Sequence, residues 1–160
     1  MRRLAPALLI ALAVTTAVSA DDVKIERLAT CQDSWLDFKE DPAKSKAFAE
    51  AFMASFNQKG NGGTFTPKTK VLVAGLPVVE AHPESVGMGV GFSVVLDAPF
   101  ATARPAVEKV MGRPLKDCEK GDGMQMCGLE IAEKKTLMLM SDEAGTSKQS
   151  LLGCYYFYAK

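Results

Sequence analysis

The first twenty residues constrain this chain most, because they have the three parts of a secretory signal peptide. Arg2 and Arg3 give a positive start, an apolar run follows over residues 4–14, and small residues end at Ala20. The apolar run has only about half of the ~20 residues that a transmembrane helix needs. The sequence therefore predicts a cleaved signal over residues 1–20 and an exported protein, periplasmic or secreted, that begins at Asp21.

Four cysteines follow the signal, and in an oxidising compartment an even number predicts two disulfides. We favour Cys118 with Cys127, because the intervening Gly121-Asp122-Gly123 can turn the chain back on itself. This choice leaves Cys31 with Cys154, a bridge that would tie the N-terminal helical region to the last strand. A redox enzyme is disfavoured, since the C-x-x-C spacing of catalytic dithiols is absent from the sequence.

Charge and hydropathy exclude two classes of partner. The whole chain has 19 basic and 19 acidic residues, so the loss of Arg2 and Arg3 leaves a slight acidic excess. The lysines are scattered among acids, as in residues 130–135, whereas nucleic-acid binding needs a clustered basic surface. We expect one disulfide-stabilised domain over residues 21–160, with no nucleic-acid partner and no transmembrane segment after cleavage.

Helical patterns dominate the first third of the mature chain. A short helix is predicted within residues 30–40, and Asp41-Pro42 predicts the start of another, because aspartate accepts amide hydrogens as N-cap and proline fits the first helical position. Phe48, Phe52 and Phe56 then recur every fourth residue. This aromatic stripe indicates a helix that packs on a sheet.

After the glycine-rich turn at residues 60–63, the apolar pattern changes to a period of two, which indicates strands. The resulting order of elements is αα-ββ-α-βββ. Short connections then favour an α+β domain of two layers, with a largely antiparallel sheet of about five strands and helices packed on it. The predicted strands cover residues 71–81, 86–97, 124–131, 136–141 and 150–158, and the third helix covers residues 99–111.

The strand predicted over residues 86–97 has glycines on one face. Gly87, Gly89 and Gly91 alternate with apolar residues and share that face with Ser93. Glycines in a strand often mark a close approach of other atoms to the backbone. We favour a packed helix or a neighbouring bulge there, with a ligand as the alternative.

The single histidine, His82, is the only candidate for general-base chemistry. If the strand extends that far, Glu80 shares its face and could orient and polarise the imidazole. No nucleophile is placed by a recognisable motif, and a zinc site would want three or four ligands. We interpret His82 as a solvent-facing turn residue and predict neither a metal site nor a cofactor.

Two methionine pairs, Met124 with Met126 and Met138 with Met140, give more information about a binding face. Alternation along the two predicted strands places Met126, Met138 and Met140 on the face opposite Cys127, Leu129, Leu137 and Leu139, provided that the hairpin matches leucine to leucine. Core or dimer packing would explain these methionines. We favour that explanation; the alternatives are contact with a protein or an apolar ligand and, after that, copper(I) binding through soft thioether sulfurs.

Three function hypotheses follow from these residues. The first is a small exported, non-enzymatic binding module for a protein or an apolar ligand, with Met126, Met138 and Met140 at the binding face. The second is a small envelope hydrolase or isomerase that uses His82 with Glu80. The third is periplasmic copper(I) handling through the methionines.

Overall fold

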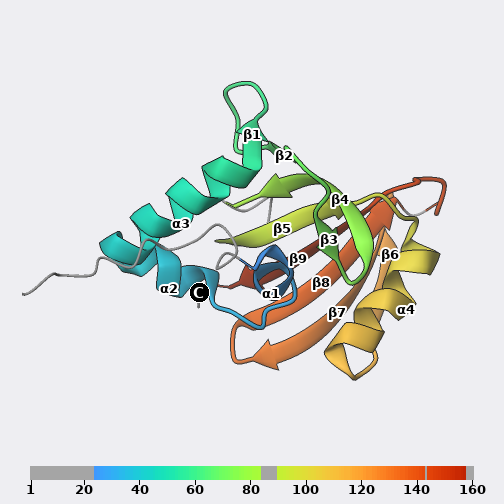
Figure 1. Cartoon of the computed structure of the whole chain (residues 1–160). Coiled ribbons are helices and arrows are strands. Elements are labelled where there is room, and N and C mark those ends of the chain that lie inside the picture. The colour runs from blue at the N-terminus through green and yellow to red at the C-terminus, as the bar shows by residue number, and fades with distance from the viewer. Residues whose placement is uncertain (1–23, 84–89, 143, 158–160) are drawn as a thin grey trace, which may run out of the picture.

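The computed structural model describes residues 24–83, 90–142 and 144–157 (Figure 1). The predicted signal peptide, its cleavage site and two of the predicted strand glycines, Gly87 and Gly89, lie outside these residues. Strands make up the larger share of the regular structure, and the helices are short. The order is α1 (Ile25–Ala29), α2 (Trp35–Glu40), α3 (Pro42–Ser55), β1 (Phe56–Gln58), β2 (Phe65–Pro67), β3 (Leu72–Val73), β4 (Leu76–His82), β5 (Val90–Leu96), α4 (Phe100–Met111), β6 (Lys116–Gly121), β7 (Met124–Ala132), β8 (Lys135–Asp142) and β9 (Ser150–Tyr156).

The nine strands found in the described residues form one antiparallel sheet. Their order across the sheet is β1-β2-β4-β5-β9-β8-β7-β6, and β3 pairs with the start of β4. The predicted two-layer α+β fold with about five strands is therefore wrong, because the chain is mostly sheet with a few short helices. The prediction missed α1, β1, β2 and β6, and it merged β3 with β4.

The missed strands have no alternating apolar pattern, so their turns and partners decide their structure. β1 and β2 flank the glycine-rich turn 60–63 and pair as a hairpin. β6 is exposed along its whole length, yet it pairs with β7 across Asp122 and Gly123. Both turn residues have positive φ, 53° and 77°, as a two-residue type I′ hairpin turn requires. Positive φ values at Ala74 and Gly75 likewise break the predicted first strand into β3 and β4.

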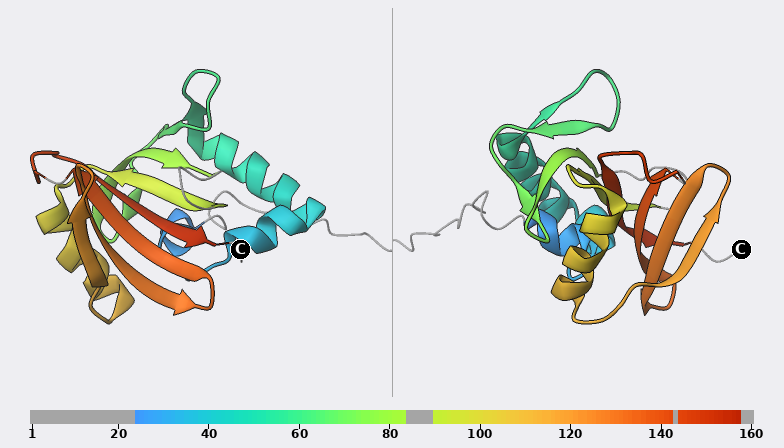
Figure 2. Two further views of the ribbon diagram at one scale, coloured as in Figure 1. Left: turned by 180° about the vertical axis from the view of Figure 1, so that it is seen from behind. Right: turned by 90° about the vertical axis from the view of Figure 1, so that its right-hand side faces the viewer.

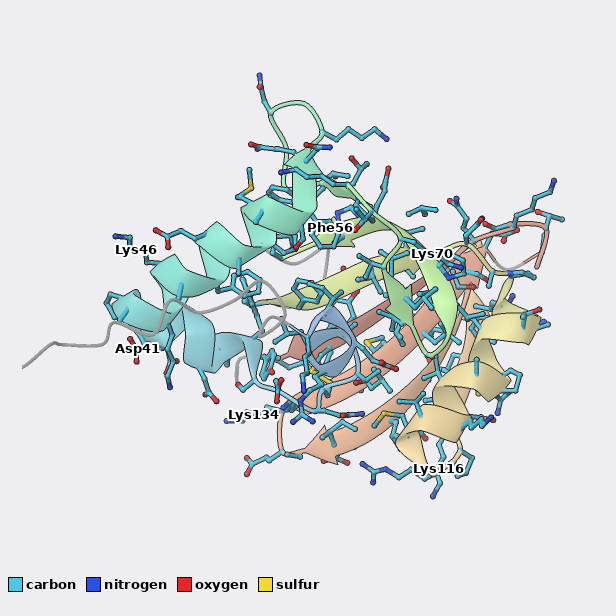
Figure 3. The ribbon with its side chains drawn as sticks, viewed as in Figure 1. Asp41, Lys46, Phe56, Lys70, Lys116 and Lys134 are labelled. Carbon is cyan, nitrogen blue, oxygen red and sulfur yellow. A yellow bond between two sulfur atoms is a disulfide. The ribbon has the colours of Figure 1, made fainter. Side chains whose placement is uncertain are left out.

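Asp41 separates two helices, as the sequence predicts. Its Oδ1 accepts hydrogen bonds from the backbone N–H groups of Ala43 at 2.9 Å and Lys44 at 3.2 Å, and Pro42 takes the first turn of α3. The cap therefore satisfies two of the amides that a helix start leaves unpaired. Figure 3 shows Asp41 at the junction of α2 and α3.

The described helices lie against one face of the sheet, which we call the inner face. Figure 2 shows this arrangement edge-on, with the helices on one side and β7, β8 and β9 on the other. The view from behind looks onto the opposite face, which we call the outer face. Within the described residues, no helix covers that outer face.

The predicted aromatic stripe packs in the core on the inner face, with Phe48 and Phe52 on α3 and Phe56 at the start of β1. The rings of Phe52 and Phe56 stack with their centroids 4.4 Å apart, and Phe48 meets Phe92 of β5 edge-to-face at 6.4 Å. Phe56 is fully buried and points inward beneath α3 in Figure 3. Edge-to-face and stacked pairs of this kind add to the burial of the rings themselves. The stripe is thus a structural feature of the helix–sheet contact.

Two disulfides fasten the fold. They join Cys31 to Cys154, across 123 residues, and Cys118 to Cys127, across nine residues. These are the same pairs that the turn at residues 121–123 favours in the sequence. Structural disulfides of this kind fit an exported protein, because they persist in oxidising compartments.

The long-range bridge is reinforced by a hydrogen bond nearby. The backbone N–H of Trp35 donates to the hydroxyl of Tyr156 at 3.1 Å, which ties the start of α2 to the end of β9. Cys31 and Cys154 are both buried. The N-terminal helical region is therefore fixed to the central strand of the sheet by a covalent bond and a buried polar contact.

Candidate functional site

The register of β7 and β8 sorts their side chains onto two faces. Leu139 pairs with Cys127 on the inner face, whereas Met140 pairs with Met126 on the outer face. Met138 also lies on the outer face because it is two residues from Met140. Strand alternation therefore places the three methionines opposite the leucines, as the leucine-to-leucine register predicts. The inner-face leucines are buried, and the outer-face methionines are only partly buried.

The methionines belong to an apolar row that crosses four strands. Val95 of β5 pairs with Leu151 of β9, Leu151 pairs with Met140 of β8, and Met140 pairs with Met126 of β7. All four side chains are partly exposed. We call Val95, Leu151, Met140 and Met126 the apolar row. Its members occupy adjacent strands in the middle of the sheet, so their positions are set by the backbone pairing.

A hollow of about 390 Å³ lies at the end of the sheet beside this row. Val95, Met140 and Leu151 line it from the row itself, and Met124, which is 45% exposed, lines it from the start of β7. The β8–β9 connection borders its other side. Three members of the row therefore form part of the wall of this shallow recess.

Asp142 holds the β8–β9 connection that borders the hollow. Its carboxylate accepts hydrogen bonds from the N–H of Thr146 at 3.0 Å, from the hydroxyl of Thr146 at 2.7 Å and from the N–H of Ser147 at 2.8 Å. These bonds lower the pKa of Asp142 below its ordinary value, with the Thr146 hydroxyl as the largest cause. The rim of the hollow is thus shaped by a local network, while its wall is shaped by the sheet.

The opposite end of the outer face is polar. Glu80 pairs with Val95 and His82 pairs with Ser93, so the two titratable side chains continue the outer face beyond the apolar row. Lys59 Nζ lies 2.8 Å from Glu80 Oε1, and His82 Nε2 lies 3.7 Å from Glu80 Oε2. Along the apolar row, the outer face therefore changes from apolar at Val95 to polar at Glu80 on the next strand.

The interpretation of His82 as a solvent-facing turn residue is wrong. His82 is the last residue of β4, its side chain is only 15% exposed, and Thr64 Oγ1 lies 3.4 Å from its Nδ1. Burial lowers the pKa of His82 below the ordinary value of 6.5, and the charge of Glu80 partly offsets that effect. The imidazole is accordingly held toward its neutral form.

We call Lys59, Thr64, Glu80 and His82 the polar group. The sequence did not predict two of its members, Lys59 and Thr64. Both flank the glycine-rich turn between β1 and β2, and pairing of that hairpin with β4 brings them beside Glu80 and His82. The sequence separation of 18 residues between Thr64 and His82 gives no signal by itself. A hairpin prediction for the glycine-rich turn would have been the way to find them.

The glycines of the outer face make room for neighbouring atoms of the same chain. A side chain at Gly91 would overlap the carbonyl oxygen of Cys154 on β9, and one at Gly153 would meet the Tyr155 ring at 2.8 Å. Tyr155 is buried, which raises its pKa, and the Ser93 hydroxyl partly offsets the rise. The close approach to Gly91 is therefore made by the adjacent strand, so this glycine does not mark a ligand.

A second cavity, of about 400 Å³, opens on the helical side between α3 and the β1–β2 hairpin. Phe48, Phe52, Phe65 and Trp35 line it, and Met53, which is 44% exposed, lies in its wall. Among the residues that the structure describes, the indole N–H of Trp35 has no hydrogen-bond partner, but it is buried and so does not face this cavity as an open donor. The aromatic walls are also the core of the helix–sheet contact.

No family model, curated protein or solved structure matches this chain. The described residues contain no cluster of three or more His, Cys, Asp or Glu side chains that could hold a metal ion. None of the described helices is long and apolar enough to cross a membrane. The functional argument therefore depends on the geometry of the outer face.

Proposed function

We propose that this chain is an exported, non-enzymatic binding module that holds a small, largely apolar ligand on the outer face of its sheet. One observation carries the proposal: the apolar row borders a hollow of about 390 Å³ on a face that no described helix covers. Small-molecule sites have volumes of about 300 to 1,000 Å³ and mostly apolar walls. Two disulfides and the signal-like N-terminus support export.

The chemistry of the row suits an adaptable site. Methionine side chains are unbranched and polarizable, so they can adjust to ligands of different shape. The strands beneath them are fixed by pairing on both sides. Because Val95 lies directly opposite Glu80, a ligand that extends along the row would bring its far end to the polar group. This favours a ligand with an apolar body and one polar end.

Binding of a neutral apolar fluorophore tests the proposal. The double variant Val95→Thr, Met140→Gln keeps the shape of both side chains but places polar atoms in the wall of the hollow. Burying polar atoms against an apolar ligand without partners is costly, and we expect affinity to fall about tenfold or more, which corresponds to about 1.4 kcal/mol. Fluorescence titration of the purified, disulfide-bonded chain measures the change.

The matched control is Met53→Gln, which makes the same swap at the mouth of the aromatic cavity. We expect it to leave the affinity unchanged. If this variant loses binding and the outer-face variant does not, the ligand binds between α3 and the β1–β2 hairpin and the proposal is wrong. If binding instead needs a second protein chain, the fluorophore will not bind either variant or the unmodified chain.

A hydrolase or isomerase that uses His82 with Glu80 is the second candidate, and the polar group favours it. The imidazole of His82 lies between the hydroxyl of Thr64, which faces its Nδ1, and the carboxylate of Glu80, which faces its Nε2. The separations of 3.4 Å and 3.7 Å are longer than the hydrogen bonds of a working general base, about 2.6 to 3.2 Å. This spacing is the reason for ranking the enzyme second.

Hydrolysis of a chromogenic ester separates the two candidates. We expect His82→Ala to leave binding of the neutral apolar fluorophore intact, because His82 does not line the hollow and this probe has no polar end to reach the imidazole. An enzyme requires turnover by the unmodified chain that falls about a hundredfold or more in His82→Ala. It also requires a comparable loss in Thr64→Val, which removes only the hydroxyl, with the fold retained in both.

A further inference from the structure

We propose that Met124, Met126 and Met140 on β7 and β8 form a copper(I) site on the outer face. The register pairs Met126 directly with Met140. Met124 lies two residues from Met126 on the same strand, so all three thioethers point to one face. This site goes beyond the binding of an apolar ligand, because it uses the sulfur atoms rather than the apolar surface.

The spacing of the three residues allows their sulfur atoms to converge. Side chains directly opposite in an antiparallel pair have Cβ atoms about 4.5 to 5.5 Å apart, and diagonal neighbours such as Met124 and Met140 lie about 7 to 8 Å apart. Methionine has three rotatable bonds beyond its Cα, so its sulfur can reach several ångströms from the strand. Met138 is not part of the site, because it pairs with Gly128, four residues or about 13 Å along β7 from Met124. Convergence of the three sulfurs therefore needs rotation of side chains and no movement of the backbone.

The donor atoms select the metal. Soft thioether ligands favour copper(I), whereas carboxylates and carbonyls favour hard ions such as calcium and magnesium. The stronger sulfur ligand, cysteine thiolate, does not compete, because all four cysteines are in disulfides. The thioethers are thus the only soft sulfur donors that the described chain offers to a metal ion.

The three side chains are also accessible from solvent. Met124 is 45% exposed, and Met126 and Met140 are partly exposed. Met124 and Met140 both line the hollow, so a metal ion can enter from that side. Asp142 lies opposite Met124 in the register, but its carboxylate is already engaged by Thr146 and Ser147.

Anaerobic competition between the full disulfide-bonded chain and a chromogenic copper(I) chelator tests the site. We expect the chain to take up a single copper(I) ion, with only sulfur neighbours in the X-ray absorption spectrum. Thiol titration before and after loading checks that both disulfides stay intact. The decisive variant is Met126→Leu, Met140→Leu, because a Met-to-Leu swap conserves volume and hydrophobicity and is tolerated well in folded proteins.

The double leucine variant should bind copper(I) at least about tenfold more weakly, since even the loss of groups outside the ligand shell costs about 10- to 100-fold in metal affinity. The control Met53→Leu removes an exposed thioether from α3 and should bind as the unmodified chain does. Both variants should retain the apolar fluorophore, so failure of the copper site and failure of the apolar site are distinguishable. Nitrogen or oxygen neighbours, unchanged affinity in the double variant, or no uptake by the unmodified chain would overturn the proposal.

Discussion

Leu139 and Met140 are neighbours on β8 whose side chains point to opposite faces, so truncating each to alanine measures which face is core. Leu139 is 0% exposed, and a fully buried Leu→Ala substitution costs about 2 to 5 kcal/mol because it leaves a cavity. Met140 is partly exposed, so its truncation forfeits only part of the ~1.5 to 3 kcal/mol of a fully buried side chain. We expect Met140→Ala to cost about 1 kcal/mol.

Equilibrium unfolding in guanidinium chloride, with both disulfides intact, measures the two losses. If the free energy of unfolding falls with denaturant concentration at the same slope in both variants, each substitution changed stability and not the compactness of the unfolded chain. The outer face is open only if the loss for Leu139→Ala clearly exceeds that for Met140→Ala. Equal losses would mean that Met140 is packed as core, and the binding-face hypothesis would then fail.

Two further predictions concern stability. Removing the Cys31–Cys154 bridge by double alanine substitution should lower the free energy of unfolding by about 5 kcal/mol, and removing Cys118–Cys127 by about 2.5 kcal/mol. The difference arises because the closed loops span 123 and nine residues. A larger loss for the short bridge in guanidinium titration would contradict this prediction. Burial lowers the pKa of His82 in the folded chain, so the unfolded chain binds the proton more readily. The stabilising effect of the neutral imidazole is therefore complete above about pH 6.5 and is lost as pH falls through the folded-state pKa. Unfolding free energies between about pH 8 and pH 5 should therefore decline less steeply in His82→Gln, and an unchanged slope would refute the assignment.

The sequence predicted those parts of the fold in which a periodic pattern and a packing surface agree. The leucine and methionine sets of β7 and β8 fell on the expected faces because a one-residue slip would exchange buried and exposed side chains. The start of α3 at Asp41 followed from capping chemistry, which is local. Long, two-faced elements could be read in this way without knowledge of their partners.

The short and polar strands could not be predicted from the sequence. β6 has the sequence of a solvated loop, and only its partner β7, the tight turn at Asp122 and Gly123 and a disulfide make it a strand. The split of β3 from β4 depends on positive φ at Ala74, a conformation that alanine rarely adopts. Tertiary pairing decided these segments against their own local preference, and the predicted count of strands was too low as a result.

The candidate site was predictable only in part, for the same reason. Alternation placed the methionines on one face, but Val95 and Leu151 join them through pairings of β5 with β9 and of β9 with β8, which no local pattern encodes. The hollow depends on a connection shaped by Asp142, and the polar group depends on a hairpin that was not predicted. Features that lie on one strand could be predicted from the sequence, whereas features that form between paired strands could not.

Methyl NMR of the chain labelled at its methionine methyl groups, during titration with the apolar fluorophore, tests the central claim most directly. Methionines lie on both sides of the molecule, with Met126, Met138 and Met140 on the outer face and Met53 at the aromatic cavity. The outer-face account predicts that the methyl signals of Met124 and Met140, which line the hollow, shift with a common affinity, while that of Met53 stays in place. A shift of the Met53 signal with the outer-face methyl groups unmoved would place the ligand beside α3 and contradict the account.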